Sequence, residues 1–499
     1  MQRPYRVLVP LGVVLAALGS ACRDLPRAAT APHGRGAALF AYHCAACHGA
    51  TGDADTPLAN LLWPRPNAFR SGRFKLVSTD NGMPTDADLV ATLRRGMPGS
   101  TMFAYGWLPD TDLQALAEHV RDLAVAGRAA DLLAEARLVR QPLAQDAAEQ
   151  RARAALRPGA PVATPPATTP DLAALEHGER LYRQHCGACH GSDGRGLPDH
   201  REWTQATSDA WARDFTAGFL RGPAHPTALA QRILAGMPAA HMPALRLPPD
   251  ATAALVAYVT TLIPDGAGDH HTQWPRQIRA ARLEALPARD DDPALRALEP
   301  VRLPTAPLRW RGDACREVWL RAAHDGHELW LELRWADAQR DDQPRPERPR
   351  GDGIAVQWTR SAEPPLLAMG SADAPVNLWR WQSYDPRETA GLVDLLQAPH
   401  GGLDAVPQLR PAARAESLRF DGPRAAATEP GDGLPLRATA TFRDGEWTAV
   451  FRRGLAARDR SEVDLRLPGP LQFAIAIWDG QIDAHAGSKA VTTWHRLEL

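Results

Sequence analysis

The stretch CGACHGSDGRGLP, from Cys186 to Pro198, places a histidine directly after the second of two cysteines. CAACHGATGDADTP, from Cys44 to Pro57, has the same pattern. C-x-x-C-H is the attachment sequence of c-type haem, in which two thiols bind the porphyrin and the histidine binds the iron. A bare C-x-x-C would instead indicate a redox dithiol or half of a zinc site. The predicted haem residues are Cys44, Cys47 and His48 in one site, and Cys186, Cys189 and His190 in the other.

The similarity of the two segments extends to the residues before each motif. A glycine lies eight positions before the first cysteine, and an aromatic residue lies four positions before it. The pairs, each 142 positions apart, are Gly36 and Gly178, Phe40 and Tyr182, and Cys44 and Cys186. Such regularity indicates a repeated unit. On a helix these spacings fall about two turns and one turn before the motif, so we expect a packed helix ending at each haem.

A loop rich in methionine and proline follows each motif: RRGMPGSTMFAYGWLPD (94–110) and LAGMPAAHMPALRLPPD (234–250). Each loop leads into an apolar-periodic segment that predicts a helix. Here the chain resembles small class I cytochrome c domains, in which the later Met of such a loop is the second iron ligand. The resemblance implies Met102 and Met242 as ligands. The alternatives are Met97, Met237 and His241, and the spare methionines would otherwise pack the haem pocket.

The composition and the N-terminus indicate an exported protein. The chain has 499 residues, enough for three domains, and a net charge of −1 that predicts no strong attraction to nucleic acid. A basic start, the short apolar run VLVPLGVVLAAL and Cys22 read as a signal peptide over 1–22. LGSAC resembles a lipoprotein signal, which implies a lipid on Cys22. Ordinary cleavage after Ala21 is the alternative. Either leads to an exported, periplasmic protein, which agrees with the attachment of haem c outside the cytoplasm that the resemblance implies.

The chain divides into five segments. After 1–22, the expected parts are a first cytochrome c domain over 33–125, a linker over 126–170, a second cytochrome c domain over 171–265 and an all-β domain over 297–499. The linker ends in RPGAPVATPPATTP, whose prolines predict an extended chain, after a part with helical character. His270 and His271, between the last two domains, are expected to be a solvated pair. The remaining cysteine, Cys315, is expected to be a lone thiol.

The C-terminal segment alternates apolar and polar residues with a period of two. EVWLRAAHDGHELWLELRW and ATATFRDGEWTAVFRRGL each contain a D-G turn and predict β-hairpins. GIAVQW and LQFAIAIWDG predict strands with buried faces. The fold class is therefore multidomain, with two small all-α cytochrome c domains and a C-terminal all-β sandwich.

Four phrases of this segment occur in the order GDGIAVQW, AMGSADAPVNLWRWQ, FAIAIWDG and GSKAVTTWHRLEL. Together they resemble the haem-binding domain of the γ subunit of ethylbenzene dehydrogenase and related DMSO reductase-type molybdoenzymes. The resemblance implies a non-covalent haem b held between Met369 and Lys489. A lysine ligand must be neutral, which requires a site with little water. The alternative ligands are His324, His327, His485 and His495. Trp379 and Trp381 would line a haem or simply pack the core.

These features favour an electron-transfer cytochrome with two haems c and one haem b. It would relay electrons between a respiratory carrier and a partner oxidoreductase, which the resemblance suggests is a periplasmic molybdopterin enzyme with its iron–sulfur subunit. Iron with two protein ligands transfers electrons and makes no bonds, so we expect no catalytic residues. Two alternatives stay open. One is a dihaem peroxidase-like enzyme with an open iron position, and the other is a dihaem protein whose β domain binds a ligand or partner without haem.

Overall fold

The structure is a computed structural model. It describes residues 34–167, 169–196, 212–267, 271–310, 314–342, 351–362, 364, 375–383, 414–420, 425–427, 435–459, 462–480 and 489–499. The expected signal segment with Cys22, and the expected ligand Met369, lie outside these residues. Among the helices of the described part, none has both the length and the apolar character needed to cross a membrane.

The first motif lies in a small helical domain. Its elements are α1 (Arg35–His43), α2 (Ala45–His48), the 3₁₀ turns η1 (Ala59–Leu61) and η2 (Phe69–Ser71), α3 (Asp86–Arg95) and α4 (Asp110–Leu138). Helix α3 begins with a capping box, in which the side chains of Thr85 and Asp88 each accept a hydrogen bond from the other's backbone N–H. Helix α1 packs on α4, and the motif residues follow on α2. The motif therefore begins where the first helix ends.

The second motif lies in a helical domain built in the same way. Its elements are α6 (Leu172–His185), α7 (Gly187–His190), α9 (Pro226–Ala235), η3 (Pro238–Ala240) and α10 (Pro249–Thr261). Helix α6 packs on α10 as α1 packs on α4. A Cβ atom on Gly36 would lie 2.0 Å from the carbonyl oxygen of Ala115, and one on Gly178 would lie 2.1 Å from that of Ala254. The repeated glycines are thus the places where the paired helices touch through their backbones.

The segment between the two helical domains is partly helical and partly tied down. Helix α4 continues to Leu138, past the expected domain end at 125, and α5 (Gln145–Ala155) folds back against it. The chain after α5 is extended, as predicted, but hydrogen bonds attach it to the first domain. The N–H groups of Val162 and Asp80 donate to the carbonyls of Ser78 (2.8 Å) and Ala160 (2.9 Å).

The C-terminal part consists of two sheets. In the described residues one sheet has the order β1-β15-β13-β7-β8-β9-β10 with β14 and β4 attached, and the other has the order β11-β12-β6-β5-β2 with β3 paired to β5. The strands of the first sheet are β1 (Gln277–Arg279), β4 (Ala306–Pro307), β7 (Gly353–Thr359), β8 (Val376–Gln382), β9 (Arg414–Phe420), β10 (Ala425–Ala427), β13 (Leu471–Trp478), β14 (Lys489–Val491) and β15 (His495–Glu498). Those of the second are β2 (Ala281–Arg282), β3 (Val301–Pro304), β5 (Glu317–His324), β6 (Glu328–Ala336), β11 (Arg437–Arg443) and β12 (Glu446–Gly454).

Both predicted hairpins are confirmed. Strands β5 and β6 are antiparallel neighbours, as are β11 and β12. Asp444 and Gly445, which join β11 to β12, both have positive φ (52° and 75°), as a tight two-residue hairpin turn requires. The β region begins earlier than the expected boundary at 297, because β1 pairs with the C-terminal strand β15 and the short helix α11 (Pro293–Arg296) follows it.

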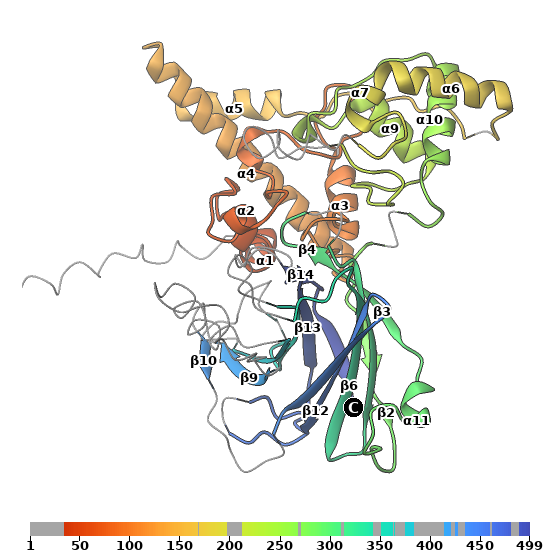
Figure 1. Cartoon of the computed structure of the whole chain (residues 1–499). Coiled ribbons are helices and arrows are strands. Elements are labelled where there is room, and N and C mark those ends of the chain that lie inside the picture. The colour runs from red at the N-terminus through yellow and green to blue at the C-terminus, as the bar shows by residue number, and fades with distance from the viewer. Residues whose placement is uncertain are drawn as a thin grey trace, which may run out of the picture.

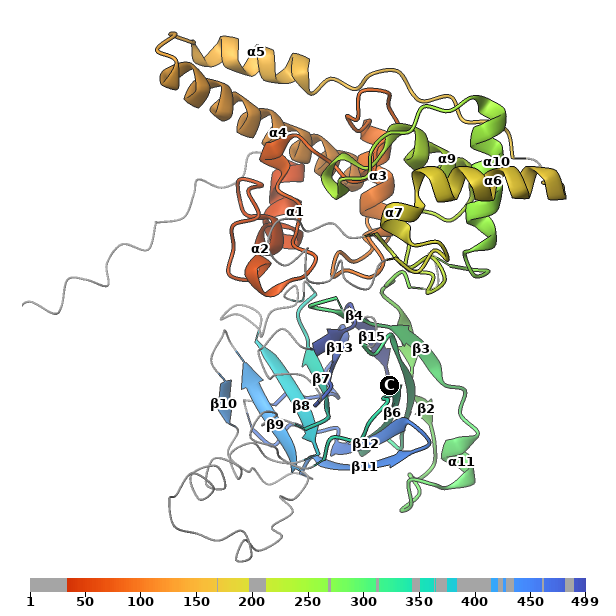
Figure 2. The ribbon, with the colours of Figure 1, turned by 45° about the horizontal axis from the view of Figure 1, so that its top comes forward.

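Side chains from the two sheets enclose one apolar core. It is rich in tryptophan and includes Trp335, Trp358, Trp379, Trp381 and Trp447. Figure 2 shows the two sheets around this interior, with the helical domains above them. The elements that meet the helical domains are the short strands β4 and β14, which lie close to α1 in Figure 1. The chain is therefore a multidomain protein with two helical domains and a β domain.

Candidate haem sites

The residues of the first motif line one cavity together with the methionine loop. Its polar and sulfur-bearing lining includes Cys44, Cys47, His48, Met97 and Met102. The rest is mainly apolar and aromatic, including Leu62, Phe69, Phe74, Leu89, Leu93 and Tyr105. The sequence-predicted cysteines, histidine and methionines are thus brought together, and both methionines of the loop reach the cavity.

His48 is held in a state that suits iron binding. Its Nδ1 is 2.9 Å from the main-chain oxygen of Asn67, and its ring stacks on Phe69 with the centroids 4.6 Å apart. Donating from Nδ1 leaves Nε2 as the nitrogen with a lone pair. Burial lowers the pKa of His48 to about 4, so the imidazole is neutral at ordinary pH. Burial also raises the pKa of Cys44 and Cys47 to about 12, which keeps both thiols uncharged.

The second motif repeats this geometry. The ring of His190 stacks on Phe215 at 4.5 Å, and burial lowers the pKa of the histidine to about 4. The main chain of Arg213 faces His190, although the Nδ1 atom makes no hydrogen bond of standard geometry. Cys186 is half-buried and Cys189 is exposed, unlike their buried counterparts Cys44 and Cys47.

The two stacking phenylalanines were not recognised in the sequence. Phe69 follows His48 by 21 residues and Phe215 follows His190 by 25, so they do not share the 142-residue offset. Their backbones nevertheless occupy equivalent positions in the two domains. The N–H of Phe69 donates to the carbonyl of Gly52, and the N–H of Phe215 donates to the carbonyl of Gly194. Gly52 and Gly194 do keep the offset of 142. These two glycines are the sequence feature from which the positions of the stacking phenylalanines could have been inferred.

The methionine loops have the same backbone fold. The N–H of Met97 donates to the carbonyl of Met102 at 2.9 Å, and that of Met237 donates to Met242 at 2.9 Å. Met102 and Met242 are partly buried against the apolar clusters of their own domains. Met237 is buried, and His241 is exposed in a left-handed backbone conformation (φ 55°). Which methionine of each loop binds iron stays a prediction, in favour of Met102 and Met242.

In the β domain, Lys489 begins strand β14 and pairs with Trp478 of β13. Its Nζ lies 5.6 Å from the centre of the Trp478 ring. The lysine is half-buried, and burial lowers its pKa, which favours the neutral amine that could bind iron. Its proposed partner, Met369, lies outside the described residues, as does His485.

The other candidate side chains of this domain lie elsewhere. His495 pairs with Phe473, whose side chain belongs to the core between the sheets. Side chains alternate along β13, so Phe473 and Trp478 project from opposite faces. Lys489 is therefore on the outer face and His495 on the inner face. His324 and His327 belong to the β5–β6 hairpin of the other sheet. Trp379 and Trp381 pack in the inner core, on the opposite face from Lys489.

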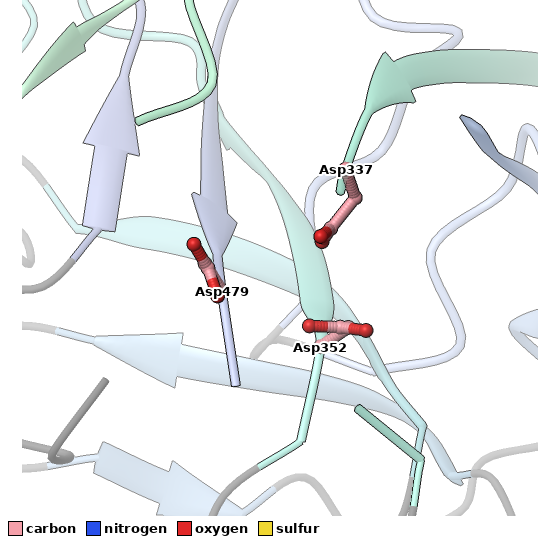
Figure 3. A group of neighbouring side chains, drawn as sticks. All are labelled: Asp337, Asp352 and Asp479. Atoms are coloured by element: carbon pink, nitrogen blue, oxygen red, sulfur yellow. The ribbon is translucent and has the colours of Figure 1, made fainter. Parts of the chain in front are cut away.

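Three aspartates from different strand ends meet at one edge of the β domain. Figure 3 shows Asp337, Asp352 and Asp479 with their carboxyl groups turned toward one another, and their oxygens lie within 4.8 Å. Burial and the neighbouring carboxylates raise the pKa of Asp337 to about 8. Burial raises that of Asp352 to about 6, although its oxygens accept hydrogen bonds from Trp447 and from the backbone of Asp341 and Gly480. Sequence reasoning missed this cluster, whose members are far apart in the chain.

Of the two histidines expected to form a solvated pair, His270 lies outside the described residues. His271 is not solvated: it is 8% exposed and stacks on Phe219 with the ring centroids 3.7 Å apart. The prediction failed because the segment packs between domains. Cys315 is a half-buried free thiol that donates to the carbonyl of Glu317, and burial raises its pKa to about 12.

The residues of both motifs fit a covalently attached haem. A neutral buried histidine, two cysteines beside it, and nearby methionine and aromatic side chains provide the attachment points, the iron ligands and the apolar surroundings that suit haem c. In the first site they line a single cavity. A bound haem would supply one-electron redox chemistry, with Cys44 and Cys47 or Cys186 and Cys189 as the attachment points.

Comparison with known proteins agrees with this reading. Residues 31–120 and 173–259 both match the family model of cytochrome c oxidase, cbb3-type, subunit III. Residues 298–490 match the model of ethylbenzene dehydrogenase. Both resemblances found in the sequence are thereby confirmed: the two helical domains are similar to cytochrome c domains, and most of the β domain is similar to ethylbenzene dehydrogenase.

Individual relatives cover parts of the chain. The protein named "Putative respiratory nitrate reductase heme subunit ORF7" of Haloferax mediterranei is 24% identical over 180 residues, which are 36% of this chain and 54% of that protein. The chain thus spans about half of the length of this relative. The reducing HAO-like protein complex of Kuenenia stuttgartiensis matches with 25% identity and a TM-score of 0.37, over 46% of this chain and 96% of that one. A family 9 carbohydrate-binding module from Caldicellulosiruptor kristjanssonii matches at 8% identity, with a TM-score of 0.26, over 45% of this chain and 96% of that one. The family matches and the nitrate reductase relative support a haem electron-transfer protein.

Proposed function

We propose that this chain, in which two cytochrome c domains of the cbb3 type precede a domain of the ethylbenzene dehydrogenase family, is a three-haem electron-transfer subunit of a respiratory oxidoreductase. Two haems c are held by the repeated motifs, and one haem b is held by the β domain with Lys489 and Met369 as iron ligands. The observation that carries the proposal is the first cavity, where a neutral histidine, two thiols and two methionines converge.

The side chains have defined roles in this function. The ring stack and the Asn67 carbonyl orient His48, so the iron-binding nitrogen is fixed before and after each electron passes. Apolar residues around the cavity exclude water and limit the reorganisation that accompanies a change of charge. Closing both axial positions with His and Met would leave no place for a substrate, which disfavours the peroxidase-like alternative.

The partner we propose is a molybdopterin oxidoreductase acting with an iron–sulfur subunit. Two findings support it: the match to ethylbenzene dehydrogenase, and the relative whose name describes a haem subunit of a respiratory nitrate reductase. We also propose that the protein is periplasmic and anchored by a lipid on Cys22. Replacing Cys22 with Ser should then move the protein from the membrane fraction to the soluble fraction, with no change in the haem content.

A haem inventory tests the cofactor content. Purified protein is extracted with acidified acetone, and pyridine haemochrome spectra are taken of both fractions. The three-haem protein should give two covalent haems and one extractable haem per chain. Two covalent haems with none extractable, from cells grown with ample haem, would leave the dihaem alternative in which the β domain serves another purpose.

Substitution of Lys489 then tests the ligand. Lys489→Ala should lose the extractable haem and keep both covalent haems. The matched control is Arg496→Ala, an exposed cation on the neighbouring strand β15, which should keep all three haems. A Lys489→Ala variant with a full haem b content and an unchanged spectrum would exclude this residue as a ligand.

A further inference from the structure

The two haem motifs have the same sequence pattern but different surroundings. Cys47 is 8% exposed, whereas its counterpart Cys189 is exposed. A thioether-bonded cysteine carries the edge of its haem, so cysteine exposure reports where that edge lies. The difference therefore bears on the part that each site plays in electron transfer.

Cys47 is covered by the β domain. It belongs to one apolar cluster with Leu62 and Phe103 of its own domain and with Leu308 and Val491 of the β domain. Val491 and Lys489 are two residues apart on strand β14, so both side chains project from the same face of the sheet. The face that carries Lys489 is thus the face that contacts Cys47.

Backbone hydrogen bonds hold this contact together. The N–H of Leu308 donates to the carbonyl of Lys489 at 2.9 Å, and the N–H of Trp63 donates to the carbonyl of Leu308 at 2.7 Å. The N–H of Trp310 in turn donates to the carbonyl of Trp63 at 2.8 Å. The path from Lys489 to the segment beside Cys47 therefore consists of two consecutive hydrogen bonds through Leu308.

Another part of the wall of the first haem cavity adjoins the second cytochrome domain. Phe74 lines that cavity and stacks on Phe69, with the centroids 5.9 Å apart. Its carbonyl accepts a hydrogen bond of 3.0 Å from the N–H of Ala239, which lies between Met237 and Met242. The methionine loop of the second site is thus joined directly to the wall of the first.

The second site is exposed to solvent at its motif cysteine Cys189. Cys189 and Ala188 of α7 are exposed, and none of the apolar clusters formed by the described residues includes Cys189. We infer that the first cytochrome site is the internal relay between the β-domain site and the second cytochrome site, and that the exposed Cys189 edge is where an external redox protein exchanges electrons. This inference rests on the proposed three-haem function.

Each step in this order transfers a single electron. The site that gives the electron is oxidised from ferrous to ferric iron, its neighbour is reduced from ferric to ferrous, and no bond forms or breaks. The external redox protein takes or supplies that electron at the Cys189 edge, and the partner enzyme does the same at the β domain. The order of sites is the same for both directions of flow.

The test uses the full-length protein with its haems, reduced chemically and mixed with an oxidised blue-copper protein, whose absorption is distinct from that of haem. Stopped-flow spectra follow the oxidation of the b-type and c-type bands separately. Met102→His should lower the potential of the first c-type haem and slow b-type oxidation by more than about tenfold, because a Met ligand raises the potential. Met102→Ala is the second variant, and the covalent haem content is measured for both. Oxidation of the b-type band at the parent rate in both variants would overturn the relay order.

A matched pair of variants tests whether electrons are exchanged with the external redox protein at the Cys189 edge. Ala46 and Ala188 occupy the same position of the two motifs, and both are exposed. Ala188→Trp should slow the oxidation of the c-type bands by the blue-copper protein at least threefold, whereas Ala46→Trp should leave it unchanged. Equal effects of the two variants would overturn the assignment of the exit. A parent protein with no b-type band would instead refute the three-haem function itself.

Discussion

A Cβ atom placed on Gly36 would lie 2.0 Å from the carbonyl oxygen of Ala115, closer than a Cβ atom and a non-bonded oxygen approach in proteins. The same contact joins Gly178 and Ala254 in the second domain at 2.1 Å. The helix that ends at each haem motif can therefore pack on the last helix of its domain only through a glycine.

Replacing Gly178 with Ala should force α6 away from α10 and lower the free energy of unfolding of the second domain by about 1–3 kcal/mol. Urea unfolding followed by the haem absorption measures this loss. The control is Gly187→Ala: this glycine is helical, its nearest neighbour atom would be 3.8 Å away, and the first motif has Ala45 at the same position. If both variants unfold at the parent urea concentration, the close helix contact has no energetic importance.

The choice between the two methionines of the first loop can be made spectroscopically. Met102→Ala should abolish one Met-to-iron charge-transfer band at the red end of the ferric spectrum, because the sulfur ligand is lost. Met97→Ala should leave the band in place while loosening the packing of the cavity that both side chains line. The reverse result would assign the iron to Met97.

The aspartate cluster should make the stability of the β domain depend on pH. The pKa of Asp337 is raised in the folded state from 3.8 to about 8, by burial first and then by Asp352. A raised pKa means that the folded protein holds the proton more tightly. The stabilisation is therefore complete below about pH 4 and is lost as the pH rises through about 8.

The Asp337→Asn variant should flatten this decline in the free energy of unfolding between those two pH values. Urea unfolding followed by tryptophan fluorescence across that range measures it. We choose Asp337 because substitution of Asp352 would also disturb three hydrogen bonds, which its carboxylate accepts from Asp341, Gly480 and Trp447. Parallel pH profiles for the variant and the parent would contradict the assignment.

The β domain contains an ion pair between two fully buried side chains. Arg453 and Glu462 have fully buried side chains with 3.8 Å between charged atoms, and burial lowers the pKa of Arg453 to about 10. Glu462→Gln should cost about 3 kcal/mol of unfolding free energy, because it leaves the buried guanidinium of Arg453 without this counter-charge and also removes the 2.6 Å ion pair of Glu462 with Arg458.

The control for this substitution is Asp291→Asn, which removes the partner of the exposed Arg289. Exposed pairs contribute little, so that variant should lose far less unfolding free energy than Glu462→Gln. Both values come from urea unfolding followed by tryptophan fluorescence. Equal losses in the two variants would show that the burial of Arg453 and Glu462 has no energetic consequence.

The sequence alone was sufficient for features that depend on neighbouring residues. The C-x-x-C-H motifs, the D-G hairpin turns and the strands GIAVQW and LQFAIAIWDG were all predicted, because their chemistry or backbone conformation is set within a few positions. The ring that stacks on the histidine of each motif was not predicted. Phe69 and Phe215 lie at different distances along the chain and reach the same place only through the folded loop.

The tertiary structure decided how these parts face one another. It buried Cys47 against Val491 and left Cys189 exposed, although the two motifs are nearly identical in sequence. It also placed Lys489 on the outer face of the sheet, away from Trp379 in the core. Sequence determined which residues can bind haem, since that follows from their own chemistry. The fold determined which site adjoins which, because packing between domains depends on contacts that no local pattern records.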